Sequence, residues 1–216
     1  MVKESTLQCV DYLIERYPDL KPCREDMKNA VIALCEMYRK GGKLLVCGNG
    51  GSASDSEHIV GELMKGFVKK RPIDDNMYAK MKEICPDEAD YLKNNLQGAL
   101  PAVSLMNAVA LNSAFANDQA PDLAMAQQVL GLGNPEDILI GISTSGKSAN
   151  VVYAVQMAKV KGMKTIGLLG GKECKLKPLV DIAISAPSPV TYKIQEYHLP
   201  IYHMLCIAVE NEFFDI

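Results

Sequence analysis

The sequence lacks the features of a nucleic-acid-binding or membrane-spanning protein. Its formal net charge is only -3, so no overall basic field would attract nucleic acid. It contains no run of about 18 apolar residues, the length that a membrane helix needs. No apolar stretch of the kind found in a secretion signal follows Met1–Ser5. We therefore expect a cytoplasmic protein with a small-molecule ligand and with neither nucleic acid nor a membrane as its partner.

The sequence also lacks a recognisable cysteine pattern. Its seven cysteines are an odd number and include no C-x-x-C pair, so they indicate neither a disulfide framework nor a cysteine zinc site. Several lie in apolar runs, as small core residues do in a reducing compartment. The 216 residues, 48% hydrophobic and 23% charged, suit a single globular domain over 1–216.

Short apolar runs alternate with helical patterns along most of the chain. Strands are predicted at 44–47, 99–105, 137–142, 165–169 and 181–185. Helices are predicted at 53–66, 107–116, 122–131, 148–161 and about 192–213. This alternation predicts an α/β fold, in which a parallel sheet is flanked by helices on both faces and ligands bind at the carboxyl ends of the strands.

Two regions lie outside this alternation. Amphipathic helices are predicted at 4–17 and 22–40, within an N-terminal region of residues 1–42. They precede the first strand and have little sheet of their own to cover, so we expect them to pack partly on another subunit. Residues 69–97 form a charged insertion with one or two small helices. This insertion is either a solvated excursion or a cover over the site, since long insertions often serve as lids.

The first candidate site is a glycine-rich loop between a strand and a helix. Gly48–Gly51 follows the apolar run and Ser52 follows the glycines, although the third glycine of G-x-G-x-x-G and the Gly-Lys-Ser/Thr of a P-loop are missing. Free N–H groups at a helix start bind anions. His58 and Glu62 are four residues apart and share one face of the helix that follows. The alternative is a strand-to-helix turn that binds no ligand.

A second anion loop follows the strand at 137–142. Ser143–Ser148 contains four hydroxyl groups, a glycine and a predicted helix start. Hydroxyl and N–H groups at such a position suit phosphate oxygens. The alternative is a serine-rich turn that only caps the helix, although a single serine would be enough for that role.

The terminal helix carries two of the three histidines, His198 and His203. Gln195 and His203 are eight residues apart and share a face, whereas His198 points in another direction. If this helix meets the one carrying His58 and Glu62, two nitrogen and two oxygen donors would suit a zinc-like ion. The alternative is that these histidines are core residues, because the two helices need not be neighbours.

Taken together, these motifs resemble those of the phosphoheptose isomerases, which have the SIS (sugar isomerase) fold. The resemblance extends over nearly the whole chain and rests on Gly48–Ser52, His58 with Glu62, Ser143–Ser148, and Lys193–His198 with His203. It implies a five-stranded parallel sheet flanked by helices and a homotetramer with sites at subunit interfaces. It also implies an aldose–ketose isomerase, an intramolecular oxidoreductase that converts sedoheptulose 7-phosphate to D-glycero-D-manno-heptose 7-phosphate.

The resemblance further implies a role for individual residues. The sugar phosphate would be held by Ser52, Ser143, Thr144, Ser145 and Ser148, with the loop amides of Gly50 and Gly51. Asn49 and Gln195 would contact the sugar, and Asp118 matches another active-site acid. Zinc would be bound by His58, Glu62, Gln195 and His203, and Glu62 and His203 would move the protons.

Two positions depart from the family pattern. Lys147 and Tyr192 stand where family members often have asparagine and aspartate, and they affect the contacts that select the sugar. The alternative function is a non-catalytic phosphosugar-binding or DnaA-interacting SIS protein. Relatives of that kind lack the glutamate and the second histidine, whereas this chain has both Glu62 and His203.

Overall fold

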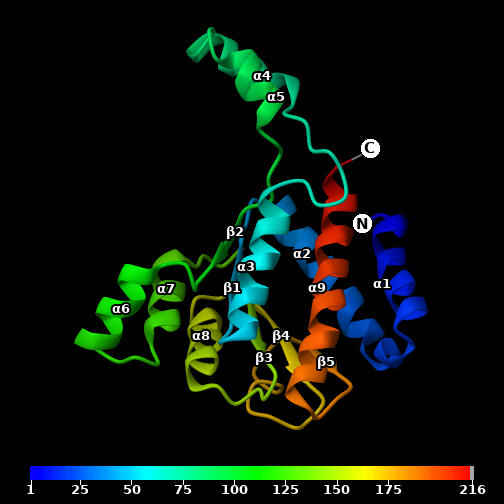
Figure 1. Ribbon diagram of the computed structural model, residues 1–216, viewed down its shortest axis with the longest axis vertical. Helices are drawn as coiled ribbons and strands as arrows, with labels where there is room; N and C mark the ends of the chain where they lie inside the picture. The colour runs from blue at the N-terminus through cyan, green and yellow to red at the C-terminus, as the bar shows by residue number, and fades with distance from the viewer. Residues whose placement is uncertain (215–216) are drawn as a thin grey trace.

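The computed structural model describes residues 1–214, which form a parallel sheet between two layers of helices (Figure 1). The strands are β1 (Leu44–Cys47), β2 (Ala102–Ser104), β3 (Ile138–Ser143), β4 (Lys164–Gly170) and β5 (Ile182–Ala186). The helices are α1 (Glu4–Arg16), α2 (Arg24–Arg39), α3 (Gly51–Met64), α4 (Asp75–Ile84), α5 (Ala89–Asn95), α6 (Val109–Asp118), α7 (Ala124–Leu132), α8 (Ala149–Val160) and α9 (Thr191–Phe213). A 3-10 helix, η1 (Pro18–Cys23), joins α1 to α2.

The sheet has the order β2-β1-β3-β4-β5, and every pair of neighbouring strands is parallel. β2 pairs with one edge of β1 and β3 with the other, so the strand order reverses direction between β1 and β3. Parallel sheets bind ligands at such a topological switch point. The loops after these two strands therefore lie side by side, in agreement with the predicted α/β class.

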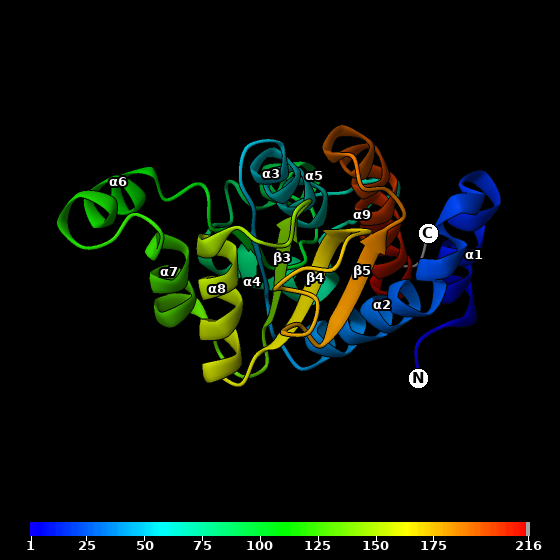
Figure 2. The same ribbon diagram turned by 90° about the horizontal axis from the view of Figure 1, so that it is seen from below.

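Alternate residues of each strand point into two separate apolar cores. Leu44 and Val46 pack on the layer of α2, α3 and α9, whereas Leu45 and Cys47 pack on the layer of α7 and α8. Figure 2 shows the helices on both faces of the strands. The central strands β1 and β3 are buried along their whole length because both of their faces are covered.

The N-terminal helices belong to the body of this chain. α1 lies along α9, and the buried carboxylate of Glu212 accepts hydrogen bonds from the Thr6 hydroxyl (2.7 Å) and the Lys3 N–H (3.0 Å). Arg39 of α2 pairs with the same carboxylate. Packing of α1 and α2 on another subunit remains a prediction.

The charged insertion forms a hairpin of two helices, α4 and α5, that extends away from the sheet (Figure 1). Polar contacts join the two helices: Lys82 pairs with Asp90 at 2.9 Å and Lys93 with Asp75 at 3.2 Å. α4 has no buried residue. The hairpin begins beyond the C-terminal end of α3, opposite the glycine loop, so within this chain it does not cover the loops after β1 and β3.

The predicted bounds differ from the structure mainly at the second strand. The expected strand 99–105 is reduced to three residues, because β2 is an edge strand that pairs only with Leu44–Val46 of β1. The other strands and helices match their predicted ranges to within a few residues. Among the described residues, no helix has the length and apolar character to cross a membrane.

Candidate active site

The glycine loop after β1 makes the sharp turn that starts α3. Gly50 has φ +56°, a conformation that side chains other than glycine rarely adopt, and the helix begins at Gly51. Ser52 is buried in the first turn, and its N–H donates to the Asn49 carbonyl at 3.0 Å. The Asn49 amide exchanges two hydrogen bonds of 2.9 Å with Asn150 at the start of α8, which joins the two predicted anion loops.

The loop after β3 is built around Gly146, whose φ is +59°. The Ser143 hydroxyl accepts the Gly146 N–H at 3.1 Å and lies 3.3 Å from the Ser148 hydroxyl. Ser145 accepts the Lys147 N–H at 3.2 Å. Ser148 precedes α8 but makes no side-chain capping hydrogen bond. The hydroxyl groups thus cluster beside the N–H groups of a helix start without being used as its cap.

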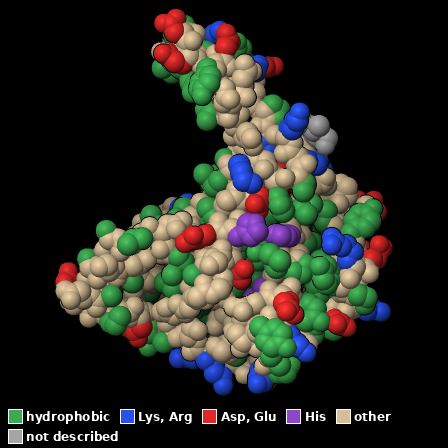
Figure 3. Space-filling model, viewed as in Figure 1, with side chains coloured by type: hydrophobic (Ala, Val, Ile, Leu, Met, Phe, Trp, Pro, Cys, Tyr) green, Lys and Arg blue, Asp and Glu red, His purple; other side chains and the backbone are tan. Residues whose placement is uncertain are grey.

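The predicted acid–base residues come together where α3 and α9 pack side by side. His58 Nε2 lies 3.3 Å from Glu62 Oε1, and the ring centroids of His58 and His203 are 5.1 Å apart. Figure 3 shows imidazole groups adjacent to one another on the surface of the body. The His58 side chain is 43% exposed, whereas that of Glu62 is only 12% exposed and its second oxygen pairs with Lys65 at 2.8 Å. The cluster is therefore open to a ligand on the histidine side.

His203 is half-buried beside these two residues. Its Nε2 atom is buried and has no hydrogen-bond partner among the described residues. Burial lowers the pKa of His203, and the neighbouring His58 lowers it further, while Glu62 acts in the opposite direction. A neutral imidazole with a free nitrogen is thereby favoured, the form that accepts a proton or binds a metal.

Tyr202 and Asp55 also border the cluster, and sequence analysis did not select either. The Tyr202 hydroxyl lies 2.9 Å from His58 Nδ1. Burial and the carboxylate of Asp55 raise the pKa of Tyr202, so the phenol stays protonated. Burial likewise raises the pKa of Asp55. Asp55 could have been found from its position three residues before His58, which places both on one helix face.

The other residues of α9 have separate positions. Gln195 lies over the start of α3: a Cβ atom added to Gly51 would be 2.5 Å from its Nε2. His198 is fully buried against the sheet, with Nε2 3.1 Å from the Leu169 carbonyl, and burial lowers its pKa to about 4. His198 therefore faces away from His203, as its helical spacing predicted.

Asp118 is not brought to this cluster. It ends α6, which has no buried residue and extends from the side of the body (Figures 1 and 2). Its carboxylate accepts a hydrogen bond from Asn117 at 2.8 Å and borders a hollow between α6 and α7. Within one chain, Asp118 and the His58–Glu62 pair belong to different parts of the surface.

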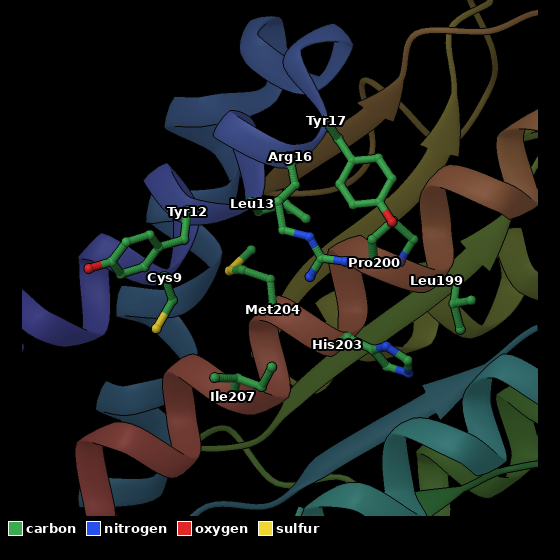
Figure 4. Close-up of a pocket in the computed structure, with 10 residues that line it drawn as sticks. All are labelled: Cys9, Tyr12, Leu13, Arg16, Tyr17, Leu199, Pro200, His203, Met204 and Ile207. Atoms are coloured by element: carbon green, nitrogen blue, oxygen red, sulfur yellow. The ribbon is translucent and has the colours of Figure 1, made fainter. Parts of the chain in front are cut away.

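A groove of about 260 Å³ between α1 and α9 reaches His203 from the other side (Figure 4). It is mainly apolar and is lined by Cys9, Tyr12, Leu13, Arg16, Tyr17, Leu199, Pro200, His203, Met204 and Ile207. His203 is thus reached both from the His58 side and from this groove.

No group of three or more His, Cys, Asp or Glu side chains in residues 1–214 is arranged as a ready metal site. The donor types nevertheless suit zinc, since His58, His203 and Glu62 supply two imidazoles and a carboxylate. The buried, unpartnered Nε2 of His203 is the atom that such an ion would satisfy. The chemistry of these residues fits the metal, and binding would require rearrangement of their side chains.

Comparison with known proteins relates this arrangement to a family. The family model of the SIS domain matches residues 20–97 and 95–170. The phosphoheptose isomerase of Helicobacter pylori strain P12 is 39% identical over 194 residues, which cover 90% of this chain and 88% of that protein. The structure of a phosphoheptose isomerase from Francisella tularensis has a TM-score of 0.74 at 30% identity, covering 96% of this chain and 94% of that one. One from Neisseria gonorrhoeae has a TM-score of 0.71 at 28% identity, covering 93% and 96%. By both sequence and fold, the chain belongs to the phosphoheptose isomerase family of SIS-domain proteins.

Proposed function

We propose that this protein catalyses the aldose–ketose isomerisation of sedoheptulose 7-phosphate to D-glycero-D-manno-heptose 7-phosphate. The observation that carries the proposal is the meeting of His58, Glu62 and His203 from two helices. All three side chains can transfer protons, and His58 and Glu62 lie on the helix that begins at the glycine loop. Family membership supplies the substrate class.

The phosphate is the part of the substrate that fixes its position. Ser143, Thr144, Ser145 and Ser148 surround the start of α8, and Ser52 with the amides of Gly50 and Gly51 surrounds the start of α3. Both helix starts direct N–H groups toward one edge of the sheet and favour a dianion there. Asn49 lies between the loops, where it would contact the sugar. Phosphate binding of this kind supplies remote binding energy that orients the reacting carbons.

Glu62 and His203 are the groups that move the proton. One removes it from the hydroxyl-bearing carbon beside the carbonyl, while the carbonyl oxygen gains a proton and an enediol forms. The enediol is then reprotonated at the former carbonyl carbon while the other hydroxyl loses its proton and becomes the aldehyde, so the reaction needs no external oxidant or reductant. His58 lies between them and is itself oriented by Tyr202. The low pKa of His203 keeps its imidazole neutral and able to take up a proton.

Zinc would be held by His58, Glu62 and His203, with Gln195 as the fourth ligand. A bound zinc ion would polarise the substrate carbonyl as a Lewis acid. Gln195 lies over Gly51 at the glycine loop, so its amide links the proposed metal ligands to the phosphate end of the site.

We further propose that the single domain of residues 1–216 works as a cytoplasmic homotetramer whose sites lie between subunits. The exposed helix α6, with Asp118 at its end, and the apolar groove between α1 and α9 support this assembly. Asp118 would then reach the site of a neighbouring subunit.

The test is incubation of the purified protein with sedoheptulose 7-phosphate, followed by chromatographic detection of the aldose. Glu62→Gln should abolish turnover, whereas Glu173→Gln, which alters an exposed glutamate that pairs with Lys177, should not change it. A parent protein that binds the phosphosugar but yields no aldose would instead indicate the non-catalytic binding function.

A further inference from the structure

A buried ion pair outside the proposed catalytic set connects α9 with the segment that follows α3. Arg71 Nε lies 2.9 Å from Glu210 Oε1, and both side chains are 0% exposed. Burying two charges is costly unless every donor and acceptor is used. The partners of each group therefore show what the pair holds in place.

Arg71 binds the end of α3. Its Nη1 donates to the Leu63 carbonyl at 2.6 Å and its Nη2 to the Glu62 carbonyl at 3.0 Å. The last carbonyls of a helix have no partner within the helix, so the guanidinium group takes the place of the missing N–H donors. One of these carbonyls belongs to Glu62, a proposed proton-transfer residue.

Glu210 binds the segment that leaves α3. Its carboxylate accepts the N–H groups of Phe67 at 2.8 Å, Val68 at 2.9 Å and Lys69 at 3.1 Å, in addition to Arg71. The Phe67 ring lies against His203, with 5.4 Å between the ring centroids. Glu210 also follows His203 by seven residues, about two helical turns, so the two side chains share one face of α9.

We propose that Arg71 and Glu210 are positioning residues that set the separation of Glu62 on α3 from His203 on α9. The inference rests on the proposed function, because it assigns these residues to the same site. The planar guanidinium group reaches three acceptors in fixed directions. A lysine ammonium keeps the charge but cannot span the Glu210 carboxylate and both α3 carbonyls in that geometry. The hydrogen bonds from residue 71 to the α3 carbonyls would then be lost or weakened, while the ion pair with Glu210 is kept.

The experiment compares Arg71→Lys with the parent enzyme in the full-length chain. We expect kcat to fall at least tenfold while KM for sedoheptulose 7-phosphate stays within about threefold, because the phosphate loops lie at the other end of α3. The matched control is Arg24→Lys, which alters an exposed pair with Asp11, and we expect its kcat to equal that of the parent. A folded Arg71→Lys protein with parental kcat, or one whose loss lies entirely in KM, would overturn the proposal.

A purely structural pair would affect melting but not the geometry of the site. We therefore add a chelator competition for zinc, in which Arg71→Lys should bind the ion at least tenfold more weakly than Arg24→Lys. If Arg71→Lys does not fold, Glu210→Asp, which keeps the charge and shortens the side chain by one methylene, is judged by the same criteria. A parent protein that produces no aldose would refute the proposed function, whereas unchanged zinc affinity in the variants would refute the positioning role.

Discussion

The close approach of Gln195 to Gly51 allows a substitution that should lower activity without lowering the stability of the fold. Gly51 is the first residue of α3, and its φ lies outside the left-handed region, so alanine suits its backbone. The added Cβ would lie 2.5 Å from Gln195 Nε2, whereas ordinary van der Waals contact begins at 3.4 Å. The Gln195 amide must then move by about 1 Å, and a misplacement of that size in an active site can cost about 100-fold in rate.

We expect Gly51→Ala to lower kcat/KM by one to two orders of magnitude, since Gln195 is a proposed ligand and substrate contact. Its stability should not fall, because alanine is favoured over glycine in helices by up to about 1 kcal/mol. The control is Gly131→Ala in α7, whose added Cβ would meet no atom of residues 1–214 outside its own helix within 4 Å. The assays are steady-state isomerase kinetics and thermal melting. Full activity in a normally folded Gly51→Ala protein would refute the placement of Gln195 in the site.

Three further predictions concern phosphate binding, acid stability and assembly. Ser143→Ala combined with Ser145→Ala should raise KM for the phosphosugar about tenfold in steady-state assays, in line with the loss of hydroxyl contacts. Unchanged KM and kcat would contradict a phosphate role for that loop. Burial would raise the pKa of Asp181, but hydrogen bonds from Lys159 and Thr165 outweigh it and lower that pKa. This carboxylate therefore stabilises the fold above its unfolded pKa of about 3.9, and the effect is lost as the pH falls through its lower folded value. Asp181→Asn should accordingly lower Tm at pH 7, and melting scans should show the difference from the parent closing below about pH 4. An equal Tm difference at about pH 7 and below about pH 4 would count against this linkage. Light scattering at micromolar concentration should give the mass of a tetramer, and a monomer would exclude sites shared between subunits.

The sequence alone predicted those parts of the site that are built from residues close together in the chain. The glycine loop, the serine-rich loop and the His58–Glu62 pair are each specified within about 15 residues of chain, and helical spacing fixes which side chains share a face. The strands were predicted because strands covered on both faces are continuously apolar. The edge strand was overestimated, since its length depends on its partner: β2 ends where pairing with Leu44–Val46 ends.

Contacts between distant segments required the tertiary structure. Spacing placed Gln195 and His203 on one face of α9, but only the packing of α9 along α3 brings His203 to His58, 145 positions earlier in the numbering (203 − 58). Tyr202 was missed because its contact with His58 joins the same two distant helices. The insertion was predicted to be helical from its own pattern, whereas only the structure shows that it extends away from the sheet (Figure 1) and that Glu210 binds the segment leading into it.

The sequence by itself thus determined the kinds of chemical group and their local order, because backbone periodicity and loop composition act over a few residues. The tertiary structure decided which groups meet. It joined α3 to α9 through the buried Arg71–Glu210 pair and left Asp118 on a separate helix. The physical reason is that burial and pairing energies between remote segments depend on the whole packed core, and no local pattern in the chain encodes them.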